Sequence, residues 1–190
     1  MSRQEWERLA AAMSTCTACD LSLSRQRVVP GQYPPGAQVL LVGEAPGREE
    51  DEGGQPFVGR SGRLLDEVLA EVGLDRADLA VVNTVKCRPP ANRTPRRAEM
   101  ATCRAWLDQQ VQAVDPSVVV TLGGSALAWA LGTGHRLREQ RGRVHADAVV
   151  GRSVVATYHP AAALRSGPAG EPMAALRADL ALVARLVRAS

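Results

Sequence analysis

The sequence predicts an α/β fold in which helices cover both faces of a parallel sheet. Short apolar runs bounded by turn residues alternate with segments whose apolar residues recur every three or four positions. The first pattern is typical of buried parallel strands and the second of amphipathic helices. Their alternation along a chain is typical of α/β proteins. We see no internal repeat and no second core, so residues 1–190 are expected to form one domain.

The strands are expected where short apolar runs lie between turn residues. Residues 38–42 form such a run, and so do residues 79–82 and 117–122. Two further candidate strands lie around Val144 and at residues 152–157, after an arginine-rich connection. Because helices separate the strands, the connections favour a parallel sheet.

Capping residues predict where the helices begin and end. Ser61 is a good N-cap for an amphipathic helix that Gly73 closes, after a long loop at residues 43–60. Thr94 is expected to cap the next helix, with Pro95 at its first position. The other helices are expected at residues 3–12, from Gly124 to about Leu131, and along the C-terminal segment after Pro160.

The composition is that of a soluble globular protein, with 45% hydrophobic and 23% charged residues. The formal net charge is +3 and the isoelectric point is about 8.9, which suits a polyanionic partner without identifying one. Lys86 is the only lysine, and GC-rich coding accounts for the arginines more simply than phosphate binding does. No apolar run reaches the ~20 residues of a membrane span. We therefore expect a cytoplasmic monomer with reduced thiols and no membrane partner.

Four cysteines are the strongest sign of a bound cofactor. Cys16 and Cys19 form a Cys-x2-Cys pair, while Cys87 and Cys103 lie far along the chain. Thiolates hold zinc or an iron–sulfur cluster, and one tight pair with two distant partners favours the cluster. Zinc and plain thiols remain alternatives, because Cys103 lies on the apolar face of an expected helix.

Three polar loops follow directly from expected strands, at Gly43, Asn83 and His159. Ligands of parallel α/β proteins bind beyond the carboxyl ends of the strands, so these loops are expected to share one site. The small residues after Gly43 let the backbone approach a ligand closely, although taken alone they are more often an ordinary turn. Phe57, the only phenylalanine, lies in a glycine- and proline-rich loop, where it either stacks on a base or anchors the loop.

The polar side chains of these loops suit a nucleobase ligand. Asn83 and Asn92 carry amides that can read the edge of a base, with capping of a turn as the structural alternative. His159 can donate a hydrogen bond to an oxygen that gains negative charge, or it caps the strand end. Leu164 and Arg165 could wedge into DNA.

Taken together, these segments resemble the family 4 uracil-DNA glycosylases, the iron–sulfur branch of the uracil-DNA glycosylase superfamily. The resemblance covers almost the whole chain, and five ordered motifs with matching separations make it specific. They are Cys16-x2-Cys19, Gly43-Glu-Ala-Pro-Gly47, Gly54-x-Pro-Phe-Val-Gly59, the segment from Asn83 to Pro95 with the later Cys103, and His159-Pro160. The resemblance implies a three-layer α/β/α sandwich around a four-stranded parallel sheet, and removal of uracil from DNA. It also implies a structural [4Fe–4S] cluster on the four cysteines, with no need for magnesium or a nucleotide.

The resemblance also assigns roles to residues. Phe57 would stack on the flipped uracil and Asn83 would read its Watson–Crick edge, while the backbone near Ala45 would hold the O2 side together with His159. The residues that match catalytic positions are Glu44, Asn92 and His159, those that match substrate-binding positions are Ala45, Glu50, Phe57, Asn83 and His159, and the DNA-inserting pair is Leu164 and Arg165.

Two departures from the family pattern bear on the chemistry. Ala161 replaces the usual serine after His159-Pro160, and residues 28–36 are similar to a related branch that traps uracil-DNA covalently. That branch has glutamine at the Ala45 position and an inserted basic loop, and neither is present here, so turnover is favoured over capture. Because Ala45 offers no carboxylate, the group that orients water is left open, with Glu44 as the candidate. A cysteine-caged nucleic-acid module without chemistry is the rival from another class.

Overall fold

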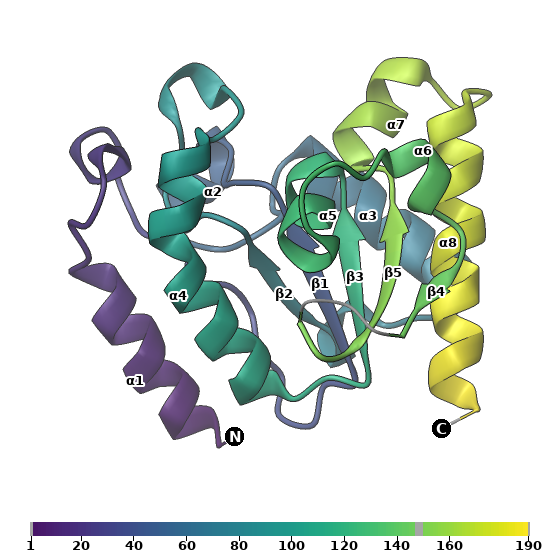
Figure 1. The fold of residues 1–190 in the computed structure, drawn as a ribbon, viewed down its shortest axis with the longest axis horizontal. Helices are drawn as coiled ribbons and strands as arrows, with labels where there is room; N and C mark the ends of the chain where they lie inside the picture. The colour runs from purple at the N-terminus through teal and green to yellow at the C-terminus, as the bar shows by residue number, and fades with distance from the viewer. Residues whose placement is uncertain (1, 147–149, 190) are drawn as a thin grey trace.

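A computed structural model of the chain describes residues 2–146 and 150–189, and within them one five-stranded sheet forms the centre of the fold (Figure 1). The strand order is β2-β1-β3-β5-β4. Four neighbouring strands run parallel, and the short β4 pairs antiparallel with β5 at the edge. The expected parallel sheet is therefore present, extended by one antiparallel strand. The strands are β1 Val39–Gly43, β2 Ala80–Asn83, β3 Val118–Leu122, β4 Val144–His145 and β5 Ser153–Thr157.

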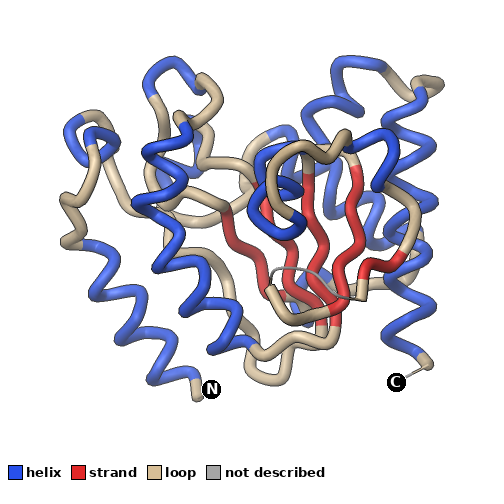
Figure 2. Tube along the Cα trace, viewed as in Figure 1, coloured by secondary structure: helices blue, strands red, loops and turns tan. Residues whose placement is uncertain are grey.

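Helices cover both faces of this sheet, as Figures 1 and 2 show. One core cluster joins α3 and α8 to one face, and a second joins α1, α4 and α5 to the other. Alternate residues of the same strand enter different clusters, as a two-sided burial of β1 requires: Val39 and Leu41 face one way, Leu40 and Val42 the other. The helices are α1 Arg3–Ser14, α2 Arg48–Gly53, α3 Arg60–Glu71, α4 Arg97–Val114, α5 Gly124–Leu131, α6 Leu137–Gln140, α7 Pro160–Ser166 and α8 Glu171–Arg188.

The start of α3 differs from the expectation. Gly59, not Ser61, is its N-cap, so the helix begins at Arg60. The Gly59 N–H donates to a carboxylate oxygen of Glu50 from the short helix α2, at 2.9 Å. The N-cap thus has no side chain that could accept an N–H of the first turn, and a carboxylate nine residues away holds its backbone instead, a contact that a local capping rule does not predict. The expected loop at residues 43–60 likewise contains α2 itself.

The start of α4 is also two residues later than expected. Arg96 is the N-cap, and Thr94-Pro95 lie before the helix. The Glu99 carboxylate accepts the Arg96 N–H at 2.6 Å and binds the Arg93 guanidinium with both oxygens, at 2.5 and 2.8 Å. This ion pair fixes the chain before α4 in an extended conformation. The C-terminal segment is likewise two helices, α7 and α8, because Gly167 with φ +77° turns the chain between them.

The carboxyl ends of the parallel strands all meet at one end of the molecule. Helices α2, α6 and α7 lie at this end, whereas both chain termini lie at the opposite end (Figure 1). The long loops that follow β1, β2 and β5 are thereby brought together. None of the described helices is long and apolar enough to cross a membrane.

The Arg93–Glu99 pair predicts a pH-dependent stability. Hydrogen bonds from Arg93, and secondly from the Arg96 backbone, lower the pKa of Glu99 to about 2. The carboxylate therefore contributes stability above the pKa of an unfolded glutamate, and this contribution is lost as the pH falls toward 2. Glu99→Gln should lower the urea midpoint at pH 7, and the gap to wild type should narrow as the pH falls from about 5. A difference in urea midpoint between wild type and Glu99→Gln that does not change as the pH falls from about 5 would contradict the lowered pKa of Glu99.

Candidate functional site

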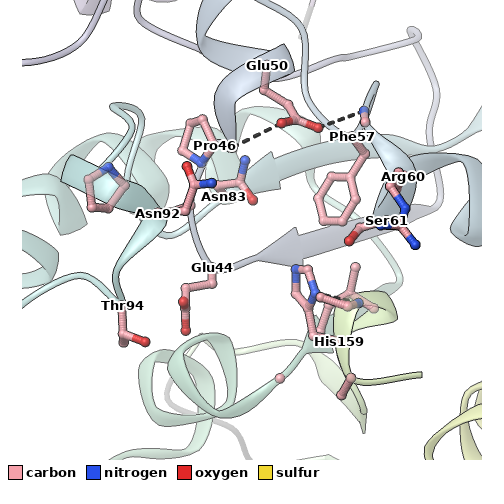
Figure 3. Close-up of a pocket in the computed structure, with 18 of the residues that line it drawn as sticks. Glu44, Pro46, Glu50, Phe57, Arg60, Ser61, Asn83, Asn92, Thr94 and His159 are labelled. Atoms are coloured by element: carbon pink, nitrogen blue, oxygen red, sulfur yellow. Dashed lines mark hydrogen bonds between the residues drawn. The ribbon is translucent and has the colours of Figure 1, made fainter. Parts of the chain in front are cut away.

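A cavity of about 760 Å³ opens at the carboxyl ends of the parallel strands (Figure 3). The loops after β1, β2 and β5 and the N-terminal ends of α3 and α5 line it. The sequence-predicted residues on its wall are Glu44, Ala45, Glu50, Phe57, Asn83, Asn92, His159 and Arg165. Three segments that are far apart along the chain thus form a single hollow, as expected from the strand-end rule.

Gly43 lets two of these side chains approach the end of β1. A Cβ atom at this position would lie 2.4 Å from the Asn83 Oδ1 and 2.6 Å from the Phe57 Cζ. Both distances are far below van der Waals contact, so only glycine fits here. The amide and the aromatic ring are therefore both held against the same backbone segment.

Phe57 adopts a left-handed backbone conformation, with φ +54°. Such a conformation is uncommon for an aromatic residue and persists only where the surrounding structure enforces it. Gly62 makes room for this backbone, since a Cβ there would lie 1.7 Å from the Phe57 carbonyl oxygen. The buried Phe57 ring lies 5.7 Å from the His159 ring, measured between centroids, with 29° between the planes. An aromatic surface is thereby presented inside the cavity (Figure 3).

Asn83 carries a buried hydrogen-bond acceptor without a partner. The side chain is 2% exposed, and its Oδ1 accepts no hydrogen bond from the described residues. A buried acceptor left unsatisfied costs about 1–3 kcal/mol, and such groups are rare in folded proteins. Its place at the wall of a cavity indicates that a bound ligand supplies the missing N–H or O–H donor.

His159 is held in one tautomer. Its Nδ1 accepts the Ala161 N–H at 3.1 Å, at the start of α7, so the ring proton of the neutral form is on Nε2. Loss of hydration in the cavity wall, and secondly the charge of Arg165, lowers the pKa of His159 to about 4. At neutral pH the residue is therefore an uncharged hydrogen-bond donor.

Glu50 contacts the backbone of two loops. One carboxylate oxygen accepts the Gly47 N–H at 3.0 Å and the other accepts the Gly59 N–H at 2.9 Å (Figure 3). Because both oxygens are engaged in this way, Glu50 fixes the loop after β1 to the start of α3. Its contacts are those of a positioning residue, and the expected contact with substrate stays a prediction.

Glu44 has a partner that the sequence analysis missed. The Ser125 hydroxyl donates to its Oε2 at 2.5 Å, from the first turn of α5. The Glu44 carbonyl accepts hydrogen bonds from the Thr84 hydroxyl and the Val85 N–H, so the end of β1 is joined to the loop after β2. The pair of glycines before Ser125, directly after a strand, was the available signal for this residue.

Asn92, Arg165 and Leu164 differ in how the structure places them relative to the cavity. Asn92 has φ +54° and accepts a hydrogen bond from the Arg88 Nε at 2.6 Å, so its orientation is set. Arg165 is exposed at the cavity. Leu164 instead is half-buried and packs against the core cluster, so it does not stand free as an inserting wedge in this conformation.

All four cysteines line a second, small cavity between the start of the chain, the loop after β2 and α4. N–H groups surround the sulfurs: Arg25 donates to Cys87 at 3.3 Å, Trp106 to Cys16 at 3.4 Å, and the backbone of Lys86 to Cys103. Burial raises the pKa of the Cys87 thiol to about 11.

Two observations bear on what this second cavity could hold. Within residues 2–146 and 150–189, no three cysteine, histidine or acidic side chains converge closely enough to hold a single metal ion. N–H donors around four thiolates are nevertheless the usual environment of a cluster larger than one ion. Four cysteines with N–H donors at their sulfurs are a ligand set that fits an iron–sulfur cluster.

Known proteins match the chain over most of its length. The family model of the Uracil DNA glycosylase superfamily matches residues 30–181. The chain belongs to this superfamily. A type-4 uracil-DNA glycosylase of Thermotoga maritima is 42% identical over 84% of this chain and 83% of its own length. Type-4 enzymes of Pyrobaculum aerophilum and Archaeoglobus fulgidus are both 40% identical, over 84% and 79% of this chain and 84% and 78% of their own lengths. The family expected from the motifs is thereby confirmed.

The contacts of Glu50 predict a specific effect of its substitution. Glu50→Gln places an NH2 group against one of two backbone N–H donors, so one of these hydrogen bonds is lost. We expect a loss of about 1–3 kcal/mol in stability and faster hydrogen exchange at Gly47 or Gly59. Glu52→Gln, on the same helix but exposed, is the matched control and should change neither. Unchanged exchange at both glycines would remove the positioning role.

Proposed function

We propose that this protein is a uracil-DNA glycosylase, which hydrolyses the N-glycosidic bond of uracil flipped out of DNA and leaves an abasic site. The observation that carries the proposal is the unpaired Oδ1 of Asn83, buried beside Phe57 and His159. The type-4 glycosylase names of the relatives support the same activity. Covalent capture draws no support from relatives that are named as glycosylases.

Uracil is complementary to this amide. Its N3–H is a donor and its O4 an acceptor, so Asn83 can accept from the first through Oδ1 and donate to the second through its NH2 group. Cytosine presents the reverse pattern, an acceptor at N3 and a donor at C4. A site that leaves buried polar groups unpaired rejects the wrong base much more strongly than a pocket of the wrong size does. Phe57 would support the ring of the extruded base by stacking.

The reaction requires the base to leave the duplex, at a cost of a few kcal/mol in stacking and pairing. As the C1′–N1 bond breaks, uracil carries away the electron pair and negative charge gathers on O2. The neutral His159 donates its Nε2–H to that oxygen, an interaction typically worth ~3–4 kcal/mol in the transition state. The backbone near Ala45 supplies further donors on the same side.

Water then completes the hydrolysis at C1′ of the sugar. Its oxygen forms the new C1′–O bond, and one of its protons leaves to a base and finally to solvent. Glu44 lines the cavity and is oriented by Ser125, so we assign it as the carboxylate that positions this water. Asn92 and Arg88, joined by their hydrogen bond, would hold the loop after β2 in place.

We further propose that the four cysteines hold a structural [4Fe–4S] cluster. Bound there, the cluster would join three separate chain segments around the loop after β2, and no magnesium or nucleotide would be needed. Arg165, exposed at the cavity mouth, would contact the DNA, with Leu164 entering the duplex only if it leaves its present packing. The monomeric state and the cytoplasmic location stay predictions.

The activity is tested with a uracil-containing oligonucleotide in the presence of a chelator. Alkali-labile abasic sites should form, and free product should be seen on a denaturing gel. An intact strand would refute the glycosylase assignment, and a persistent protein–DNA band would favour capture.

The substitution Asn83→Ala tests how much the amide contributes to recognition of the base. Removal of both hydrogen bonds should lower kcat/KM for uracil excision by about 100-fold or more, while the fold is retained. The control is Gln38→Ala, an exposed amide at the opposite end of the sheet. Excision by Asn83→Ala within a few-fold of the control would exclude Asn83 as the reader.

The low pKa of His159 predicts that the rate of uracil excision does not depend on pH in the range where an ordinary histidine titrates. Because its pKa lies near 4 and the neutral form is the donor, kcat should not fall as the pH is lowered from 8 to about 5.5, through the ordinary histidine pKa. The profile is measured under single turnover. An inflection near pH 6.5 that disappears in His159→Gln would show that a histidine with an ordinary pKa governs the reaction instead.

A further inference from the structure

Lys86 is the only lysine of the chain, and it is one of its most deeply buried side chains, at 2% exposure. The residue lies in the loop after β2, three positions after Asn83 and directly before Cys87. Apart from the three histidines, every other basic side chain of the protein is an arginine. A compact ammonium group is thus used at the one basic position that is enclosed on all sides.

The ammonium joins the two sites described above. Its Nζ donates to the backbone carbonyl of Asn83 at 2.5 Å, and the same side chain lines the small cavity with the four cysteines. No carboxylate forms an ion pair with Lys86 in the part of the chain that the structure describes.

A buried cation without a counter-charge is unfavourable, so buried ammonium groups are normally paired. Four metal-bound thiolates carry net negative charge, whatever the metal, and would supply the missing partner. The Asn83 carbonyl accepts a hydrogen bond from one N–H of the ammonium, and this bond holds the carbonyl in place.

We propose that Lys86 is a positioning residue, which holds the backbone of the base-reading Asn83 against the cysteine cage and balances the negative charge of the occupied cage. Occupation of the cage would thereby set the position of the Asn83 amide. The proposal rests on the proposed glycosylase function for its consequence in catalysis.

The neighbouring contacts extend this link to the other cavity loop. Thr84 and Val85, between Asn83 and Lys86, donate the two hydrogen bonds to the Glu44 carbonyl. On the other side, the Lys86 carbonyl accepts the Val29 N–H at 2.8 Å. A displacement of the Lys86 ammonium would therefore be transmitted to both walls of the uracil cavity.

The test uses Lys86→Met, which keeps a long flexible side chain but removes the charge and the donor. Gln110→Met is the matched control, because Gln110 is fully buried on α4 and also donates to a backbone carbonyl, that of Pro30, at 2.5 Å. Lys86→Met should lower single-turnover excision of uracil about tenfold and speed the loss of iron to a chelator about tenfold. Gln110→Met should change neither rate. Wild-type rates for both in Lys86→Met would overturn the proposal.

A double-mutant cycle separates positioning from general destabilisation. If Lys86 acts through Asn83, then Lys86→Met should slow excision by at most about twofold when Asn83 is already alanine. Effects that multiply in the double variant would show that Lys86 acts elsewhere.

A measurement on the unaltered protein keeps the proposal testable should Lys86→Met fail to fold. Labelling with [13Cε]lysine gives a single side-chain NMR signal, since Lys86 is the only lysine. The signal should lie away from that of free lysine, and it should shift when the metal is stripped and when uracil and abasic DNA are added. A signal at the free-lysine position that responds to neither would overturn the proposal. Absence of uracil excision with a metal-sensitive signal would refute the proposed function while keeping the contact with the cage.

Discussion

The close approach of Asn83 and Phe57 to the backbone of Gly43 is the constraint on which the uracil cavity depends. With no side chain at the end of β1, an amide from β2 and an aromatic ring from a distant loop reach the same point. The register of β1 and β2 places Gly43 opposite Asn83, so the sheet itself sets this meeting. A larger residue at Gly43 would displace both groups that are assigned to hold the base.

The cavity is built at the expense of local stability. Asn83 keeps a buried acceptor unpaired, Phe57 holds an unfavourable backbone conformation, and Lys86 buries a charge. Each of these features is costly alone and is maintained by neighbouring contacts, such as the close packing of Gly62 on Phe57. Strain and unpaired polar groups gathered in one place are typical of sites that complete their contacts only with a ligand.

Much of the fold followed from patterns along the chain. The parallel strands, the helices that cover them and the gathering of polar loops at the strand ends were predicted from apolar periodicity, and the structure has them. The helix starts at Ser61 and Thr94 were wrong. In each case the N-cap is neither serine nor threonine, and its own backbone N–H donates to a carboxylate, that of Glu50 or Glu99. Ser125 was missed because its partner, Glu44, is 81 residues away along the chain.

The sequence by itself determined the type of fold, the family, and the residues that carry the chemistry, because these depend on local periodicity and on residue types at fixed spacings. Only the tertiary structure decided what those residues contact. It made Glu50 a support for two loops, packed the half-buried Leu164 against the core and left the Asn83 oxygen unpaired. It also enclosed Lys86 between Asn83 and the cysteines. Hydrogen bonds and burial are properties of groups brought together by the sheet, and no spacing along the chain records them.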